Sequence, residues 1–242
     1  ALYPCIVHPF QYDCRMSTTD DLPREVPPSQ IRYASGGAIE EIFNSITHAV
    51  GAGLAIAGLV AIMILVGEDP SPWKYVAYSI YGASMILLFL GSAIMHSFAA
   101  MPRVRRILLI LDQAFIFVLI AGTYTPICLI AIRDSWGWAM FGIVWALAIV
   151  GIVLKATVFQ KESLKTDIIY VPMGWMIVLI FRPVIQATST GFIVWALIGG
   201  ACYTIGVVFY AWRRLPFAHV VWHLFVIAGC VSFYLGYALH LT

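Results

Sequence analysis

The sequence has few charged residues for its length. Only 11% of its 242 residues are Asp, Glu, Lys or Arg, whereas 62% are hydrophobic. A soluble domain carries roughly a quarter charged residues, so this composition indicates a membrane protein. The formal net charge is only +2, and no basic run is interleaved with aromatic residues. Both features argue against nucleic acid as a partner.

Other absences narrow the class of membrane protein. The five cysteines show none of the paired spacings of a metal-binding knuckle. No lysine follows Lys165, which excludes a retinal Schiff base in the last helix. Asp112 is the only carboxylate inside a long apolar run, whereas a proton pump would need carboxylates at several depths.

Long apolar segments fill the chain beyond residue 40. A helix of ~20 residues spans the ~30 Å hydrocarbon core of a bilayer, and spanning segments must satisfy their own backbone. The sequence therefore predicts an all-α membrane protein with seven transmembrane helices. The segments are 42–67, 75–102, 107–132, 135–154, Asp167 to about Ala187, a sixth that follows the turn at 187–191 and reaches Trp212, and 215–241.

The first part of the chain has a different composition. Residues 1–39 hold five of the twelve prolines and few apolar runs. They also lack the basic start and apolar stretch of a signal peptide. We expect a flexible cytoplasmic tail over 1–39 and a seven-helix transmembrane domain over 40–242.

The basic residues predict the orientation. Eleven would lie on the N-terminal side of the membrane and three on the other, which places the N-terminus in the cytoplasm and the C-terminus outside. The eleven are Arg15, Arg24, Arg32, Arg103, Arg105, Arg106, Lys155, Lys161, Lys165, Arg213 and Arg214; the three are Lys74, Arg133 and Arg182. Arg182 falls inside the fifth segment, and it could either reach the membrane edge or face the bundle interior.

Four ionisable side chains from three segments share one depth near the cytoplasmic side. His96, Asp112, His219 and His223 each lie ~7 to ~13 Å of helix rise from the nearest basic residue of a loop. Ser92 lies one turn deeper than His96 on the same helix face. Such groups are costly in lipid, so we expect them to face one another or a cavity.

The spacing of the histidines predicts a metal site. His219 and His223 stand at i and i+4 on one helix face, and His96 would supply a third ligand from another helix. Three histidines with an open fourth position are typical of a catalytic zinc site. A zinc-bound hydroxide and an ionised Asp112 would balance the two charges of Zn²⁺. Asp112 would then act as the base on the water, and Ser92 would donate a hydrogen bond.

A simpler interpretation stays open for each histidine taken alone. A single histidine inside a membrane is more often a hydrogen-bonding group between helices than a ligand. The shared depth of the four groups favours a metal site over separate hydrogen-bonding histidines. By contrast, His48 precedes a run of small residues, "AVGAGLAIAG", which indicates close helix packing.

Four motifs in order resemble the hemolysin III family. They are "EEIFNSITHAVGAG" (40–53), "SAIMH" (92–96), "DQAFIFVLIAGTYTP" (112–126) and "HVVWH" (219–223). That family is the bacterial branch of the progestin and adipoQ receptors, which include adiponectin receptors. The resemblance covers residues 38–242. It implies a seven-helix fold with a cytoplasmic N-terminus, in a bacterial inner membrane.

The resemblance also implies a site. By position, His96, His219 and His223 match the family's zinc-binding histidines. Asp112 matches its acidic residue near the zinc-bound water, and Ser92 matches its serine. Glu41 and Asn44 match a polar motif at the start of the first helix, where we expect them to cap or brace that helix end. Pro126 lies ~21 Å beyond Asp112 and is expected to kink the third helix.

Three functions follow as alternatives. The first is a zinc-dependent lipid hydrolase, because the resemblance extends to alkaline ceramidases; its substrate would be a membrane lipid with an amide or ester bond. The second is a receptor-like sensor in which zinc is structural. The third is a cytolytic activity, which the absence of an amphipathic pore-lining stretch disfavours. The sequence leaves the oligomeric state open.

Overall fold

The structure is a computed structural model, and it describes residues 37–158, 167, 169–212 and 214–242. Seven helical spans in this part of the chain are long and apolar enough to cross a membrane, and the same residues contain no strand. The prediction of an all-α protein with seven transmembrane helices is therefore confirmed. Residues 1–36 of the predicted tail lie outside the described residues, and the first helix begins at Ala38.

Several helix starts follow from local sequence. Pro72 and Pro102 each occupy the first helical position, where the missing N–H costs nothing. Ser189 accepts a hydrogen bond from the backbone N–H of Phe192 and so caps the helix that follows. The helices are α1 (Ala38–Val66), α2 (Pro72–Ser97), α3 (Pro102–Pro126), α4 (Trp138–Thr157), α6 (Tyr170–Gly174), α7 (Phe181–Ala187), α8 (Thr190–Ala211) and α9 (Ala218–His240).

Three spans depart from α-helical geometry over part of their length. After Pro126 the third span continues as π-helical η2 (Ile127–Ala131), and η3 (Arg133–Gly137) leads into α4. The fifth span changes from α6 to the 3₁₀ helix η4 (Trp175–Ile180) and then to α7. The hydroxyl of Tyr124 donates to the Gly174 carbonyl at 2.6 Å and accepts from the Ile177 N–H at 2.7 Å. It thereby satisfies backbone groups that the irregular helix exposes.

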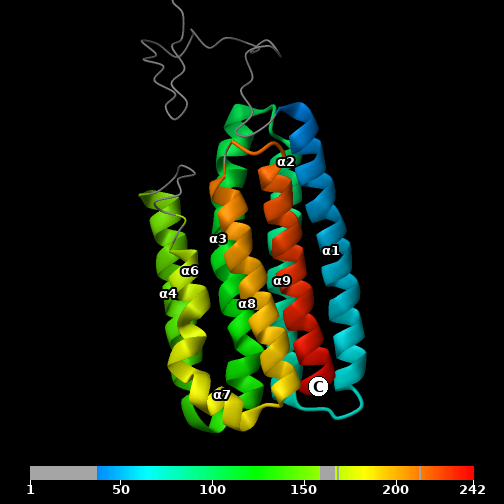
Figure 1. Cartoon of the computed structure of the whole chain (residues 1–242), viewed down its shortest axis with the longest axis vertical. Coiled ribbons are helices and arrows are strands. Elements are labelled where there is room, and N and C mark those ends of the chain that lie inside the picture. Colours follow the sequence, from blue (N-terminus) through cyan, green and yellow to red (C-terminus); the bar gives the residue numbers. More distant parts are fainter. Residues whose placement is uncertain (1–36, 159–166, 168, 213) are drawn as a thin grey trace, which may run out of the picture. The chain divides into compact units, whose positions relative to one another are not determined.

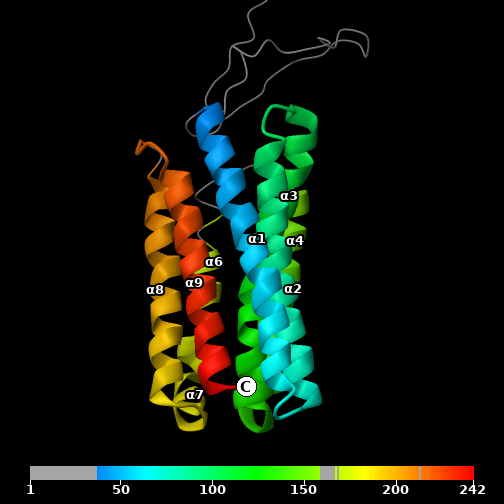
Figure 2. The ribbon, with the colours of Figure 1, turned by 90° about the vertical axis from the view of Figure 1, so that its right-hand side faces the viewer.

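Consecutive helices pack side by side. α1, α2, α3 and α4 form successive neighbours, α8 packs along α9, and α9 contacts α1 (Figures 1 and 2). The approach of α1 to α2 is close at Gly51, where an added Cβ would lie 2.9 Å from the Phe89 ring. The fifth span packs on α3.

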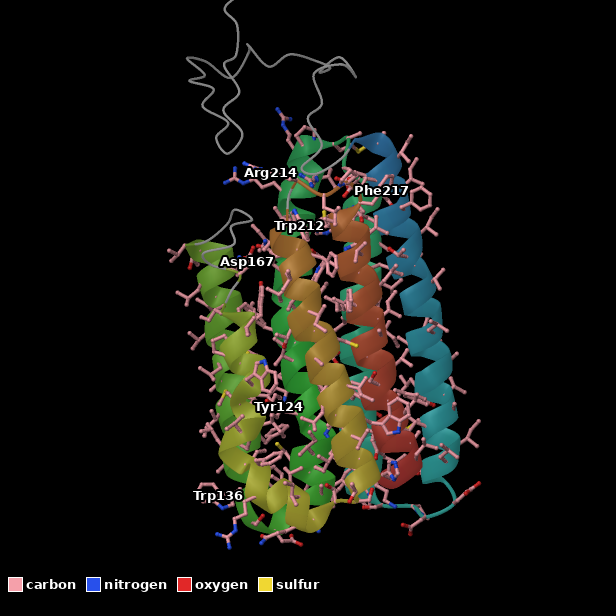
Figure 3. The ribbon with its side chains drawn as sticks, in the orientation of Figure 1. Tyr124, Trp136, Asp167, Trp212, Arg214 and Phe217 are labelled. Atoms are coloured by element: carbon pink, nitrogen blue, oxygen red, sulfur yellow. The ribbon has the colours of Figure 1, made fainter. Side chains whose placement is uncertain are left out.

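The two ends of the bundle carry different residues. We call the end where α1 and α9 begin and α2 ends the histidine end. Asp167, Arg214 and Phe217 lie toward this end, Trp136 lies at the opposite end, and Tyr124 lies between them (Figure 3). At the opposite end, Arg182 of α7 is exposed beside Trp136 and Gln186. It therefore does not face the bundle interior.

α1 shows the polarity expected of a membrane helix. Its outer face exposes large apolar side chains such as Ile42, Ile46 and Val50, whereas its inner face buries polar ones. Because lipid tails are apolar, a spanning helix keeps polar groups on the side that faces the bundle. This arrangement brings the polar residues of α1 against the ends of α2 and α9.

Candidate metal centre

Three histidines from two helices meet inside the bundle. His96 stands in the last turn of α2, and His219 and His223 stand in the first turns of α9. One ring nitrogen from each lies within 4.8 Å of the others, and His96 and His223 are buried. The ring centroids are 5.2 Å (His96–His219), 5.0 Å (His96–His223) and 4.6 Å (His219–His223) apart. This cluster could hold a metal ion, as the i, i+4 spacing predicts.

α1 fixes the ring of His96 by an acidic side chain. The Nδ1 atom of His96 lies 2.5 Å from Oε2 of Glu41, and both side chains are buried. A carboxylate accepts hydrogen bonds, so in a neutral ring the proton belongs on Nδ1 and a lone pair remains on Nε2. That Nε2 atom is buried and has no hydrogen-bond partner among the described residues. A histidine held by a carboxylate, with its other nitrogen bare, is the usual arrangement of a metal ligand.

α1 orients His223 in the same way. The Thr47 hydroxyl lies 2.9 Å from two carbonyl oxygens of its own helix, to which it can donate its single proton. Its oxygen is then free to accept from Nδ1 of His223, 3.3 Å away. The Nε2 lone pair of His223 is thereby left for a cation. Two of the three histidines thus present the nitrogen that a metal would need, and the residues present fit a bound metal ion.

Glu41 also forms an ion pair with a basic residue of α3. Arg105 lies in the first turn of α3, and its Nη2 atom is 3.6 Å from Oε1 of Glu41. Glu41 therefore links α1, α2 and α3, which agrees with the expectation of a bracing residue. It does not cap α1, because Gly37 occupies the N-cap without a side-chain hydrogen bond. Asn44 has no side-chain hydrogen-bond partner among the described residues, so it neither caps nor braces through one.

A cavity of about 220 Å³ adjoins the cluster. The three histidines line it together with Asp112, which is half-buried, and Ser92, which is buried. Its described lining includes four carboxylates (Glu40, Glu41, Asp112 and Asp167) and a single guanidinium group, that of Arg105. An excess of carboxylates favours a bound cation.

Away from the histidines, the cavity lining is mostly apolar, with a few hydroxyl groups such as those of Thr123 and Thr204. Its walls there come from α3, α8, α9 and the fifth span, and they reach deep into the bundle. The apolar lining residues include Leu119, Ile120, Ile177, Ile193, Val207, Val226 and Phe233. The cavity therefore has a polar end at the histidines and an apolar end suited to a hydrocarbon chain.

A buried ion pair lies at the same end of the bundle and was missed by the sequence analysis. Lys155 of α4 is 1% exposed and donates to Asp167, which is 4% exposed. The hydroxyl of Tyr210 in α8 donates to the other oxygen of Asp167 at 2.5 Å. The prediction that the fourth segment ends at residue 154, with Lys155 in the loop beyond it, is wrong because α4 extends past Lys155. A lysine at the end of an apolar run looks the same in sequence whether it is buried or solvated.

His48 is also part of this region, which close helix packing alone did not predict. Its ring stacks on that of His223 with centroids 3.5 Å apart and meets Phe89 edge-on at 5.2 Å. It lines the cavity and is 3% exposed. The spacing of Asn44 and His48 on one helix face was the signal that could have revealed it.

Comparison with known proteins identifies the family. The sequence pattern described as Haemolysin-III related matches residues 37–234. The chain belongs to the haemolysin-III family. This match includes Glu41, His48, Asp112 and all three clustered histidines.

Individual relatives agree with that result. Hemolysin-3 of Bacillus cereus is 41% identical over 202 residues, which is 81% of this chain and 91% of the relative. A Hemolysin-3 homolog of Bacillus subtilis is 38% identical over 201 residues, covering 81% and 94%. The monocyte to macrophage differentiation factor of Homo sapiens is 27% identical over 204 residues, covering 81% and 82%. The chain is thus an integral membrane protein of a family with bacterial members and more distant human relatives.

Proposed function

We propose that the protein is a zinc-dependent hydrolase that cleaves an amide or ester bond of a membrane lipid. The observation that carries this proposal is the histidine cluster at the polar end of an otherwise apolar cavity. A three-histidine site leaves a coordination position open, which is typical of catalytic rather than structural zinc.

Each residue has a role in this proposal. His96, His219 and His223 would hold the metal, with Glu41 and Thr47 keeping two of the rings in place. Zinc bound there would supply a Lewis acid that polarises the carbonyl and activates a water molecule. Asp112 would take a proton from that water and pass it to the leaving nitrogen or oxygen. Ser92 would donate a hydrogen bond to the substrate carbonyl.

The shape of the cavity supports a lipid substrate. The acyl chain of a lipid would occupy the apolar part of the cavity, and its amide or ester group would lie near the histidines. Burial of apolar surface contributes roughly 25 cal/mol per Å², so the chain would provide most of the binding energy. A ceramide-like lipid has this combination of a long chain and an amide bond.

Orientation and location belong to the same proposal. Without the buried Lys155, the count of basic residues falls from eleven to ten against three, which still favours a cytoplasmic N-terminus. The histidine end would then lie in the cytoplasmic leaflet of a bacterial inner membrane. The substrate would be a lipid of that leaflet.

A receptor-like sensor with a structural metal is the second candidate. It is favoured by one observation, which is that the cluster joins α2 to α9. In that case metal removal would lower the thermal stability of the protein but would abolish no turnover.

The test is hydrolysis of a lipid panel. Purified, zinc-loaded protein is incubated with ceramides, N-acyl amines and phospholipid esters, and fatty acid release is measured by mass spectrometry. We expect release that stops when the metal is chelated and resumes when zinc is restored. If a preparation whose fold is verified releases no fatty acid from any lipid, the hydrolase hypothesis is wrong and the sensor remains as the candidate function.

A further inference from the structure

Three buried polar side chains follow one face of α1 toward the histidine cluster. Glu40, Asn44 and His48 are spaced i, i+4 and i+8, so they share a helix face. They are 3%, 0% and 3% exposed. Together they hold five of the eight buried side-chain nitrogen and oxygen atoms that have no hydrogen-bond partner among the described residues. Buried polar groups without a partner cost free energy, so proteins almost always provide one.

The chemistry of the three side chains indicates which ligand would satisfy them. The Glu40 carboxylate accepts hydrogen bonds, the Asn44 amide both donates and accepts, and a neutral His48 ring does one of each. A cation would be repelled by the amide protons of Asn44, and an anion would be repelled by the Glu40 carboxylate. Neither kind of ion therefore suits the whole row. Water both donates and accepts, so it can satisfy the whole row.

Two of the three side chains line the cavity beside the histidines, and Asn44 lies between them on the same helix face. Glu40 and His48 both line the cavity that the histidine cluster lines. That cavity measures about 220 Å³, and one buried water needs about 10–15 Å³ of such volume. The eight steps from Glu40 to His48 rise ~12 Å along α1, and the ring of His48 stacks on His223.

We propose that the inner face of α1, formed by Glu40, Asn44 and His48, binds a file of ordered water molecules that leads from the start of α1 to the histidine cluster. Water binding here does not depend on catalysis. The second part of the inference, that the file supplies the water consumed by hydrolysis, rests on the proposed function. In that reaction the water oxygen bonds to the acyl carbon, the bond to nitrogen or oxygen breaks, and a proton goes to the leaving group.

X-ray radiolytic labelling tests the water file directly. Radiolysis produces hydroxyl radicals from water, and a buried side chain is labelled when a bound water lies beside it. The experiment uses the full metal-loaded chain in detergent after removal of lipid. We expect His48 to be labelled although it is buried. Met140 is the internal control, since it is 2% exposed, is intrinsically more reactive and does not line the cavity.

A pair of variants separates a water file from general reactivity. Asn44→Leu removes the middle polar group and should abolish most of the labelling of His48. Ile46→Leu changes the exposed face of the same helix and should leave that labelling unchanged. Circular dichroism and thermal unfolding confirm that both variants are folded; if Asn44→Leu does not fold, Asn44→Ala takes its place.

The outcomes are distinct. An unlabelled His48 in folded protein overturns the water file. The supply role requires that Asn44→Leu keep its metal and lose turnover. If no lipid is hydrolysed by the parent protein, the proposed function fails while the labelling result still decides whether water is bound.

Discussion

The histidine end and the opposite end of the bundle differ in how their buried polar groups are satisfied. From the middle of the bundle to the opposite end, tyrosine hydroxyls bond to backbone carbonyls: Tyr78 donates to Leu241 at 2.8 Å, Tyr81 donates to Cys230 at 2.9 Å, and Tyr237 donates to Thr123. At the histidine end, charged side chains bond to one another across helices.

The tyrosine bonds contribute to the stability of the bundle, whereas the groups at the histidine end are suited to binding a ligand. A hydroxyl paired with a carbonyl is a neutral bond that joins two helices and leaves neither group in need of a ligand. The histidine end instead presents bare ring nitrogens, several carboxylates and orphaned amide atoms next to a cavity. Changes at the two ends should therefore affect different measurements.

The largest expected effect is the loss of the metal from the histidine cluster. His219→Ala combined with His223→Ala removes two of three ligands, and one remaining histidine cannot hold zinc tightly. Metal content measured by mass spectrometry should fall from about one zinc per chain to a small fraction of that. His240→Ala, at the exposed far end of α9, is the control. Equal zinc in the parent and the double variant would refute the site.

The next effect separates metal binding from chemistry. Asp112→Asn keeps the shape of the side chain but removes the proposed base, so turnover should drop by about 10²- to 10⁴-fold while zinc content is retained. Lipid hydrolysis and metal content are measured on the same sample, with Asp69→Asn at the opposite end as the control. Undiminished turnover would exclude Asp112 as the base.

The buried ion pair should contribute to stability much more than an exposed one. Lys155→Met removes the buried ammonium group that donates to Asp167, which should cost about 3–5 kcal/mol of unfolding free energy. Lys74→Met breaks a Lys–Asp pair at the opposite end whose Asp69 side chain is 84% exposed, and it should cost about 0–1 kcal/mol. The unfolding free energies of the two variants are measured in detergent. Similar losses of free energy would mean that burial does not strengthen the contribution of the Lys155 pair.

Glu41 should tune metal affinity rather than abolish it. Glu41→Gln weakens the hold on His96, so the zinc dissociation constant should rise by about 10- to 100-fold. Competition with a fluorescent chelator measures it. Glu40→Gln is the matched control on the neighbouring residue, because the ring of His96 bonds to Glu41 and not to Glu40. If the zinc dissociation constant rises equally in both variants, the cause is the lost negative charge and not the hydrogen bond between Glu41 and His96.

The smallest effect is expected from a tyrosine away from the histidine end. Tyr81→Phe removes one hydrogen bond to the Cys230 carbonyl and should cost about 1 kcal/mol of unfolding free energy. Zinc content and turnover should not change. A loss of metal in this variant would show that the two ends are coupled and would weaken the comparison.

Much of the fold could be predicted from the sequence, because lipid imposes simple requirements on it. A run of about 20 uncharged apolar residues has few options other than a spanning helix, and all seven predicted spans are present. The pairing of His219 and His223 was equally accessible, since i, i+4 residues share a face in any helix.

Contacts between helices were less predictable. Glu41 lies 55 residues from His96, and no periodicity within one helix indicates which residue of another helix it will meet. Lys155 appeared to be a loop residue because a charge at the end of an apolar run usually marks a boundary. His48 was assigned to packing because its neighbours are small.

The sequence alone determined the number of spans, the helix that carries each histidine and their common depth, because these follow from hydrophobicity and the geometry of a single helix. Only the tertiary structure decided which groups meet: Glu41 on His96, Thr47 and His48 on His223, and Asp167 on Lys155 and Tyr210. Those choices depend on the rotation and register of packed helices, which are fixed by side-chain contacts throughout the bundle and not by any one segment.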